Sequence, residues 1–252
     1  MIYKNQKIIV ANWKMNPVSF DEVNNLVSII RKNIKKTENV KVVICSPSIF
    51  ISKINNNKSF DLGIQNVFWE DQGAYTGEIS AKMAKNMDIE YAIVGHSERR
   101  LYMKETDEMI NQKIQSVLNS NLKPILCVGE TADEKNQDLA SDVIISQIEK
   151  ALMGVNKSKI PNILIAYEPV WAIGTGEIPS INEIMSTVLL VRKIITNLYD
   201  RATAERVFVL YGGSVNGQNA FDIVDKTGMN GLLIGSASLN GSEFVRIVNL
   251  FG

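Results

Sequence analysis

The chain has 252 residues, of which 45% are hydrophobic and 21% are charged, a composition typical of a globular protein. Lysine and arginine together number 27, as do aspartate and glutamate. No excess of charge therefore predicts binding to nucleic acid or to a membrane surface.

Short apolar runs with the character of buried strands recur along the whole chain. They cover residues 7–11, 40–45, 61–64, 91–94, 123–128, 163–166, 207–211 and 231–234. Longer helical stretches lie between them, at residues 20–34, 106–119, 142–152, 181–199, 218–225 and 242–250. Strands that alternate with helices predict a parallel sheet. Eight such units predict an α/β protein with a single closed (β/α)8 barrel as one domain over residues 1–252. An open doubly wound sheet is the alternative, but no G-x-G-x-x-G motif follows the first strand.

Localisation and metal content follow from simple features of the chain. The first ten residues lack the apolar core of a secretory signal, and no stretch is long and apolar enough to span a bilayer. Cys45 and Cys127 stand apart in apolar runs, which favours reduced core thiols over a disulfide. We therefore expect a cytoplasmic protein. A single histidine leaves little material for a transition-metal site.

Polar residues and glycines follow the apolar runs. In a (β/α)8 barrel these positions gather at one mouth, where active sites lie. The set comprises Asn12, Lys14, His96, Glu98, Glu168, Ser214, Gly235 and Ser236. The glycine-rich turns 212–214 and 235–236 let backbone N–H groups approach an anion closely, which predicts a phosphate site, although tight turns need glycines in any case.

Glu168 ends the sixth apolar run, and the following proline biases it toward extended backbone. The segment after it reads as a hinged lid, formed by Pro169, Val170, Trp171, Ala172, Ile173, Gly174, Thr175, Gly176, Glu177, Ile178 and Pro179. A carboxylate beside a lid predicts a catalytic base. On this stretch alone, a structural glutamate in a salt bridge beside an ordinary glycine turn is an equal alternative.

His96 is the only histidine and directly precedes a predicted helix start. The positive end of a helix disfavours a charged ring, so we expect a neutral imidazole that can donate to a carbonyl. Lys14 would stabilise an oxyanion or a phosphate, with Glu98 as its candidate partner. The alternatives are a histidine satisfied in the core and a lysine that extends into solvent. Together with a carboxylate base and a phosphate cradle, these groups suit proton abstraction beside the carbonyl of a small phosphorylated sugar, without cofactor or metal.

Six stretches of the chain resemble the triosephosphate isomerase family and occur in that family's order. They are residues 11–16 (ANWKMN), 65–71 (QNVFWED), 77–80 (GEIS), 95–100 (GHSERR), 166–176 (AYEPVWAIGTG) and 211–215 (YGGSV). The resemblance implies interconversion of dihydroxyacetone phosphate and D-glyceraldehyde 3-phosphate through an enediolate. Another sugar-phosphate isomerase or epimerase on a phosphate-binding barrel, or a non-catalytic phosphate-binding scaffold, is the alternative.

The resemblance also implies roles for individual residues. Glu168 would move a proton between C1 and C2, and His96 would polarise the carbonyl and pass protons between the oxygens. Lys14 would stabilise the enediolate, with Glu98 behind it. The substrate and its phosphate would be bound by Asn12, Lys14, Gly174, Ser214, Gly235 and Ser236. Ile173 and Leu233 would close over Glu168 as an apolar pair and exclude water.

The family forms dimers, and the loop 65–78 resembles its interface loop. Gln65 and Thr76 would make dimer contacts, with Thr76 reaching toward the partner's Asn12 and Lys14. The loop also carries the aromatic residues Phe68, Trp69 and Tyr75. A monomer would expose these rings unless they fold back on their own barrel.

Two positions depart from the family pattern. Ser236 stands where the family usually has a glycine, which would strain the backbone if that residue needed a positive φ, and we expect weaker phosphate binding at most. Pro179 has no N–H, so the family's hydrogen bond from that position to Tyr211 is expected to be absent. A contact between Ser214 and Gly176 would remain available, and the proline would stiffen the hinge.

Overall fold

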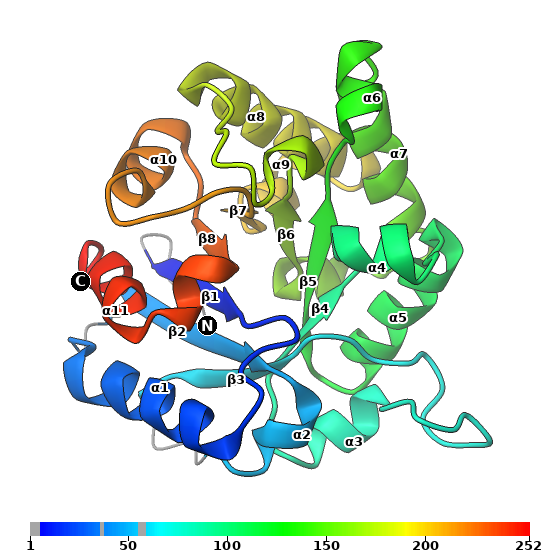
Figure 1. Cartoon of the computed structure of the whole chain (residues 1–252). Coiled ribbons are helices and arrows are strands. Elements are labelled where there is room, and N and C mark those ends of the chain that lie inside the picture. The colour runs from blue at the N-terminus through cyan, green and yellow to red at the C-terminus, as the bar shows by residue number, and fades with distance from the viewer. Residues whose placement is uncertain (1–5, 36–37, 55–58) are drawn as a thin grey trace.

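The computed structural model describes residues 6–35, 38–54 and 59–252. Residues 1–5, which belong to the stretch searched for a secretory signal, lie outside the described residues. Figure 1 shows an inner ring of strands surrounded by helices. The strands pair in parallel in the order β1-β2-β3-β4-β5-β6-β7-β8, and β1 also pairs with β8, so the sheet is closed. The prediction of a closed (β/α)8 barrel is confirmed.

The strand bounds agree with the sequence-based prediction to within one residue at each end. The strands are β1 (Lys7–Asn12), β2 (Val40–Ser46), β3 (Asp61–Ile64), β4 (Tyr91–Val94), β5 (Lys123–Val128), β6 (Leu164–Tyr167), β7 (Phe208–Tyr211) and β8 (Gly231–Ile234). One small shift concerns the proposed base. We predicted that the sixth strand ends on Glu168, but β6 ends on Tyr167 and Glu168 is the first residue beyond it.

The helices of the described residues include all six long predicted ones. The α-helices are α1 (Phe20–Asn33), α2 (Ser48–Ile51), α3 (Ala81–Lys85), α4 (Ser97–Tyr102), α5 (Asp107–Asn119), α6 (Ala132–Asn136), α7 (Ala140–Ala151), α8 (Ile181–Leu198), α9 (Arg201–Ala204), α10 (Ala220–Thr227) and α11 (Gly241–Asn249). Three 3₁₀ segments accompany them: η1 (Lys157–Asn162), η2 (Val170–Ala172) and η3 (Ser236–Leu239). The start of α4 was predicted directly after His96, but the other short helices escaped prediction because four or five residues are too few to display a 3.6-residue period.

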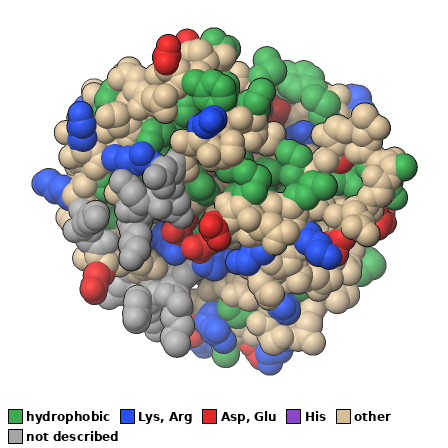
Figure 2. All heavy atoms as spheres, turned by 90° about the horizontal axis from the view of Figure 1, so that it is seen from below, with side chains coloured by type: hydrophobic (Ala, Val, Ile, Leu, Met, Phe, Trp, Pro, Cys, Tyr) green, Lys and Arg blue, Asp and Glu red, His purple; other side chains and the backbone are tan. Residues whose placement is uncertain are grey.

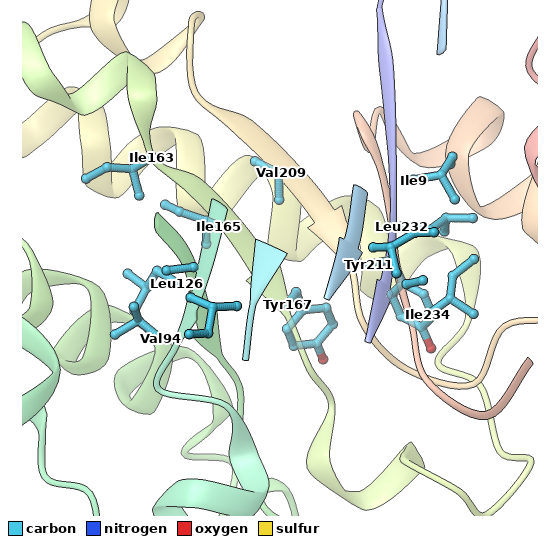
Figure 3. Close-up of a cluster of buried hydrophobic side chains, with 14 of the residues drawn as sticks. Ile9, Val94, Leu126, Ile163, Ile165, Tyr167, Val209, Tyr211, Leu232 and Ile234 are labelled. Carbon is cyan, nitrogen blue, oxygen red and sulfur yellow. The ribbon is translucent and has the colours of Figure 1, made fainter. Parts of the chain in front are cut away.

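Strand side chains alternate between two buried layers, which explains why the strands are apolar throughout. Ile8 and Val10 point into the barrel, whereas Ile9 packs in the layer between strands and helices. Figure 3 shows part of this outer layer, including Leu126 and Val209. Both cysteines lie in the inner cluster as buried free thiols, as predicted. Among the described residues, no helix is both long and apolar enough to cross a bilayer.

Candidate active site

The carboxyl ends of the strands bring the predicted catalytic and phosphate-binding residues to one pocket. Its lining includes Asn12, Lys14, His96, Glu168, Ile173, Gly174, Ser214, Leu233, Gly235 and Ser236. These residues come from the ends of five different strands or the loops that follow them. Glu98, the remaining member of the predicted set, lies behind the pocket in contact with Lys14.

Glu168 is held by three contacts directly after β6. Its backbone N–H donates to the carbonyl of Val128 at 2.8 Å, which continues the pairing with β5. Oε1 lies 3.1 Å from Nε2 of His96, and Oε2 accepts the backbone N–H of Ser97 at 3.0 Å. The residue is only 2% exposed. A carboxylate is thus buried beside an imidazole, and both of its oxygens have partners.

The surroundings of Glu168 favour its charged form. Burial raises the pKa of this carboxyl, but the His96 ring, the N–H of Ser97 and the Lys14 ammonium lower it by more. The pKa of Glu168 therefore lies below its usual value. In this arrangement the carboxylate is ionised at neutral pH and available to accept a proton.

His96 occupies the N-cap of α4, the position expected from the sequence. Its Nδ1 accepts the backbone N–H of Glu98 at 3.3 Å, and the proton of the neutral ring is accordingly assigned to Nε2, which faces Glu168. Burial lowers the pKa of His96, but the carboxylates of Glu168 and Glu98 raise it by more, so the pKa lies above its usual value. This increase depends mainly on contact with Glu168 and runs against the neutral ring expected from the helix start.

Lys14 adopts an uncommon backbone conformation, with φ at 53°. Its N–H donates to Oδ1 of Asn12 at 3.1 Å, and its carbonyl accepts Nε2 of Gln65 at 2.9 Å. Its Nζ donates to Oε1 of Glu98 at 2.6 Å. Gly235 allows the side chain to pass, because a Cβ there would lie 3.3 Å from the Lys14 Cε. These contacts fix the ammonium at the pocket.

Ser236 carries no backbone strain. It opens η3 and is not among the residues with a positive φ, so the condition under which a serine would be costly is not met. The carbonyl of Gly235 accepts both the N–H and the hydroxyl of Ser238, at 2.9 and 2.6 Å. The turn after β8 is therefore rigid, and its first two residues face the pocket.

The lid segment 169–179 is fixed at both ends and exposed in the middle. Residues 174–178 are exposed, whereas Ala172 and Pro179 are buried. The hydroxyl of Ser214 donates to the carbonyl of Ala172 at 2.8 Å, so in this structure it contacts the lid at that residue and not at Gly176. The hydroxyl of Tyr211 is buried without a hydrogen-bond partner among the described residues.

Two groups at the site were missed by sequence reasoning. Oε1 of Glu130 accepts the hydroxyl of Tyr167 at 3.1 Å and Nε1 of Trp171 at 2.7 Å, which ties the start of the lid to the end of β5. Glu130 follows β5 just as the other site residues follow their strands, so its position after an apolar run could have identified it from the sequence. The second group is the N–H of Ser97, and a backbone group carries no residue-specific signal.

The loop 65–78 lies beside the mouth of the barrel. The ring of Phe68 stacks on that of Trp69, with centroids 3.9 Å apart, and makes a tilted contact with the ring of Tyr75, with centroids 4.5 Å apart. Tyr75 remains 45% exposed, and Thr76 is exposed at the loop end. Figure 2 shows the molecule from below the view of Figure 1, the side on which α1, α2 and α3 lie, with hydrophobic side chains at the surface. Gln65 donates to carbonyls of its own chain, those of Lys14 and Cys45.

Comparison with known proteins gives a consistent result along the whole chain. The family model described as triosephosphate isomerase matches residues 7–251. The chain is 44% identical over 245 residues to the triosephosphate isomerase of Alkaliphilus oremlandii and 43% identical over 246 residues to that of Dictyoglomus thermophilum. Each of these alignments covers 96% of this chain and 98% of the relative. The triosephosphate isomerase of Clostridium tetani is 38% identical over 252 residues, 98% of each chain.

Proposed function

The chain belongs to the triosephosphate isomerase family and interconverts dihydroxyacetone phosphate and D-glyceraldehyde 3-phosphate, and we propose that Glu168, His96 and Lys14 perform the chemistry. The observation that carries this assignment is the contact of 3.1 Å between Oε1 of Glu168 and Nε2 of His96 in the pocket that Lys14 also lines. A base, a hydrogen-bond donor and a cation in one pocket are the groups that enediolate formation requires.

Glu168 is the base in this proposal. It removes a proton from the carbon beside the substrate carbonyl and returns it to the neighbouring carbon. The carboxylate must leave the N–H of Ser97 to reach a carbon-bound proton, because that hydrogen bond occupies Oε2. Loss of this contact removes one of the causes that lower its pKa, and the carboxylate becomes a stronger base as it moves.

His96 donates from Nε2 to the carbonyl oxygen and passes protons between the two substrate oxygens. The raised pKa of His96 depends on Glu168 as a neighbour. Once the substrate lies between the two groups, burial and the N–H of Glu98 at Nδ1 favour the neutral ring. A neutral imidazole can both donate and accept a proton, so it returns to its starting state within each turnover.

Lys14 stabilises the negative charge of the enediolate. Its ammonium is held by Glu98 at 2.6 Å and its backbone by Asn12, so both are positioned before the substrate arrives. Asn12 also lines the pocket and offers its amide N–H₂ to the substrate. We assign Glu98 to positioning, since it contacts Lys14 and not the pocket.

The phosphate is bound by backbone N–H groups and a hydroxyl on one side of the pocket. Gly235 and Ser236 follow β8, Ser214 follows β7, and Gly174 lies on the lid. Closure of the lid would add Gly174 to the phosphate site and bring Ile173 and Leu233 over Glu168. Excluding water in this way strengthens every electrostatic contact inside and protects the enediolate.

We further propose one catalytic domain, a cytoplasmic location and a homodimer formed through the loop 65–78. Free buried thiols at Cys45 and Cys127 fit a reducing compartment. Met15, which lines a cavity together with Gln65, and Tyr75 on the loop are 90% and 45% exposed and would be covered by a partner. The intrachain bonds of Gln65 support a role in shaping the interface through Lys14.

The proposal is tested by a coupled assay of D-glyceraldehyde 3-phosphate turnover with the wild type and Glu168→Asp. The shorter side chain withdraws the carboxylate from the substrate carbon, so kcat should fall by about a hundredfold or more. Inorganic phosphate should inhibit both proteins to the same degree, because the phosphate site is unchanged. A wild type that binds phosphate without turnover would instead indicate a non-catalytic scaffold.

A further inference from the structure

Lys135 lies between the two ends of the lid segment 169–179, although it belongs to neither. It is part of the short helix α6, which follows β5, while the lid leads from β6 into α8 (Figure 1). Its Nζ lies 3.3 Å from the centroid of the Trp171 ring and 3.3 Å from Oε1 of Glu183. One ammonium group therefore contacts Trp171 near the start of the lid and Glu183 in the helix that directly follows its end.

The contact at the first end is with the face of an aromatic ring. Trp171 belongs to η2, directly after Pro169, and its Nε1 donates to Oε1 of Glu130 at 2.7 Å. The carboxylate of Glu130 thus holds the edge of the ring, and the ammonium of Lys135 is attracted to its electron-rich face. Both partners come from the segment that follows β5.

The contact at the second end is with the carboxylate that caps α8. Oε2 of Glu183 accepts the N–H of Ser180 at 2.7 Å, and the hydroxyl of Ser180 accepts the N–H of Glu183 at 3.2 Å. This capping box fixes the residue that directly follows Pro179. Oε1 of the same carboxylate is left to pair with Lys135.

Between these two anchors the lid has few constraints. Gly174 and Gly176 adopt left-handed conformations with φ at 74° and 82°, and residues 174–178 are exposed. Because the tip of the lid makes so few contacts, its position is determined by the residues that anchor the two ends of the segment. A group that contacts both ends also determines their separation, and hence where the tip arrives when it folds over the pocket.

We propose that Lys135 is a positioning residue that links the two ends of the lid through Trp171 and Glu183 and thereby sets where the lid arrives when it closes over the substrate. This inference rests on the proposed function of the segment 169–179 as a lid. The pair with Glu183 is largely exposed, with 37% and 51% of the side chains accessible, so it adds little to the stability of the fold. Replacing Lys135 should therefore affect the lid without unfolding the barrel.

Three variants of the full chain test this role. Lys135→Met keeps the aliphatic stem and removes the charge, and Lys135→Arg keeps a cation over the ring. Lys150→Met is the matched control, since Lys150 lies at the far end of α7, is 49% exposed and pairs with Asp107 at 3.4 Å. The measurements are kcat and KM for D-glyceraldehyde 3-phosphate, the melting temperature, and the ¹⁹F NMR signal of Trp171 in protein labelled with fluorotryptophan.

We expect Lys135→Met to lower kcat/KM by about two- to fivefold, the size of a lost cation–ring contact, with an unchanged melting temperature. The Trp171 signal should shift while those of Trp13 and Trp69 stay, Lys135→Arg should restore both readouts, and Lys150→Met should resemble the wild type. An unchanged kcat/KM in Lys135→Met would overturn the inference, as would an equal fall in Lys150→Met or a loss that follows the melting temperature. An inactive wild type would refute the proposed function and not this inference. The NMR measurement would still test the inference in that case, because an unchanged Trp171 signal in Lys135→Met would refute the contact between Lys135 and the lid.

Discussion

The backbone N–H of Ser97 donates to Oε2 of Glu168 at 3.0 Å in the buried part of the pocket. The contact stabilises the ionised carboxylate, but it also occupies one of the two oxygens that would accept a proton from a substrate carbon. Ser97 is the first residue of α4 and His96 is its N-cap, so one helix start holds both sides of the acid–base pair. The resting position of the base is thus set by the same turn that orients the imidazole.

Replacing Glu168 by glutamine should lower the pKa of His96. The contact with the carboxylate raises this pKa against the effect of burial, and the neutral amide removes the cause while burial remains. The single histidine makes the measurement simple, because its ring signals in an NMR pH titration need no further assignment. An unchanged or higher titration midpoint in Glu168→Gln would contradict the assigned coupling.

The same pair predicts a dependence of stability on pH. Because the folded pKa of His96 is raised, its protonation stabilises the fold below the unfolded value of about 6.5, and this contribution is lost as the pH rises through the folded pKa. Denaturant unfolding of the wild type and Glu168→Gln across this range should show the loss in the wild type alone. Parallel curves for the two proteins would argue against it.

Tyr211→Phe should leave activity nearly unchanged. The hydroxyl of Tyr211 is buried without a partner among the described residues, and Pro179 has no N–H to offer it. We expect kcat within about twofold of the wild type and a change in unfolding free energy below about 1 kcal/mol. Tyr167→Phe is the matched control, because its hydroxyl donates to the Glu130 carboxylate at 3.1 Å and its loss should cost about 1.5–3 kcal/mol. A large fall of kcat in Tyr211→Phe would show that the hydroxyl has a role in closure.

Ser236→Gly should bring no gain in substrate affinity. Ser236 opens a 3₁₀ segment without a positive φ, so glycine relieves no strain there. The backbone N–H that we assign to the phosphate is present in both residues. We expect KM to stay within about twofold, since at most one hydroxyl contact is lost. A KM several-fold lower in the variant would indicate that the serine hinders phosphate binding.

Thr76→Arg should dissociate the proposed homodimer. Thr76 is exposed in the isolated chain, so the fold tolerates arginine, whereas an interface would bury an unpaired guanidinium. Because such burial costs several kcal/mol, the dissociation constant measured by sedimentation should rise by about a hundredfold or more. Thr196→Arg, at an exposed position of α8, serves as the control. A monomeric wild type, or a variant that stays dimeric, would refute this interface.

The barrel could be predicted from the sequence because parallel strands buried on both faces leave continuous apolar runs, such as residues 123–128. The residues of the pocket could be predicted because they follow those runs. Two contacts could not be predicted: the hydrogen bond of Ser97 to Glu168 and the contact of Lys135 with Trp171. Each joins segments that are distant in the sequence and meet only in the folded chain. The short helix α6 that carries Lys135 has no periodicity to reveal it.

The central claim is that a carboxylate at position 168 transfers a proton between the substrate carbons. Conversion of dihydroxyacetone phosphate in deuterium oxide tests it most directly, because a proton held on a carboxylate exchanges with solvent. We expect deuterium at C2 of the D-glyceraldehyde 3-phosphate formed by the wild type, and a rate lower by about 10²–10⁴ in Glu168→Gln. Product that retains all of its hydrogen, formed at an undiminished rate by Glu168→Gln, would contradict the account.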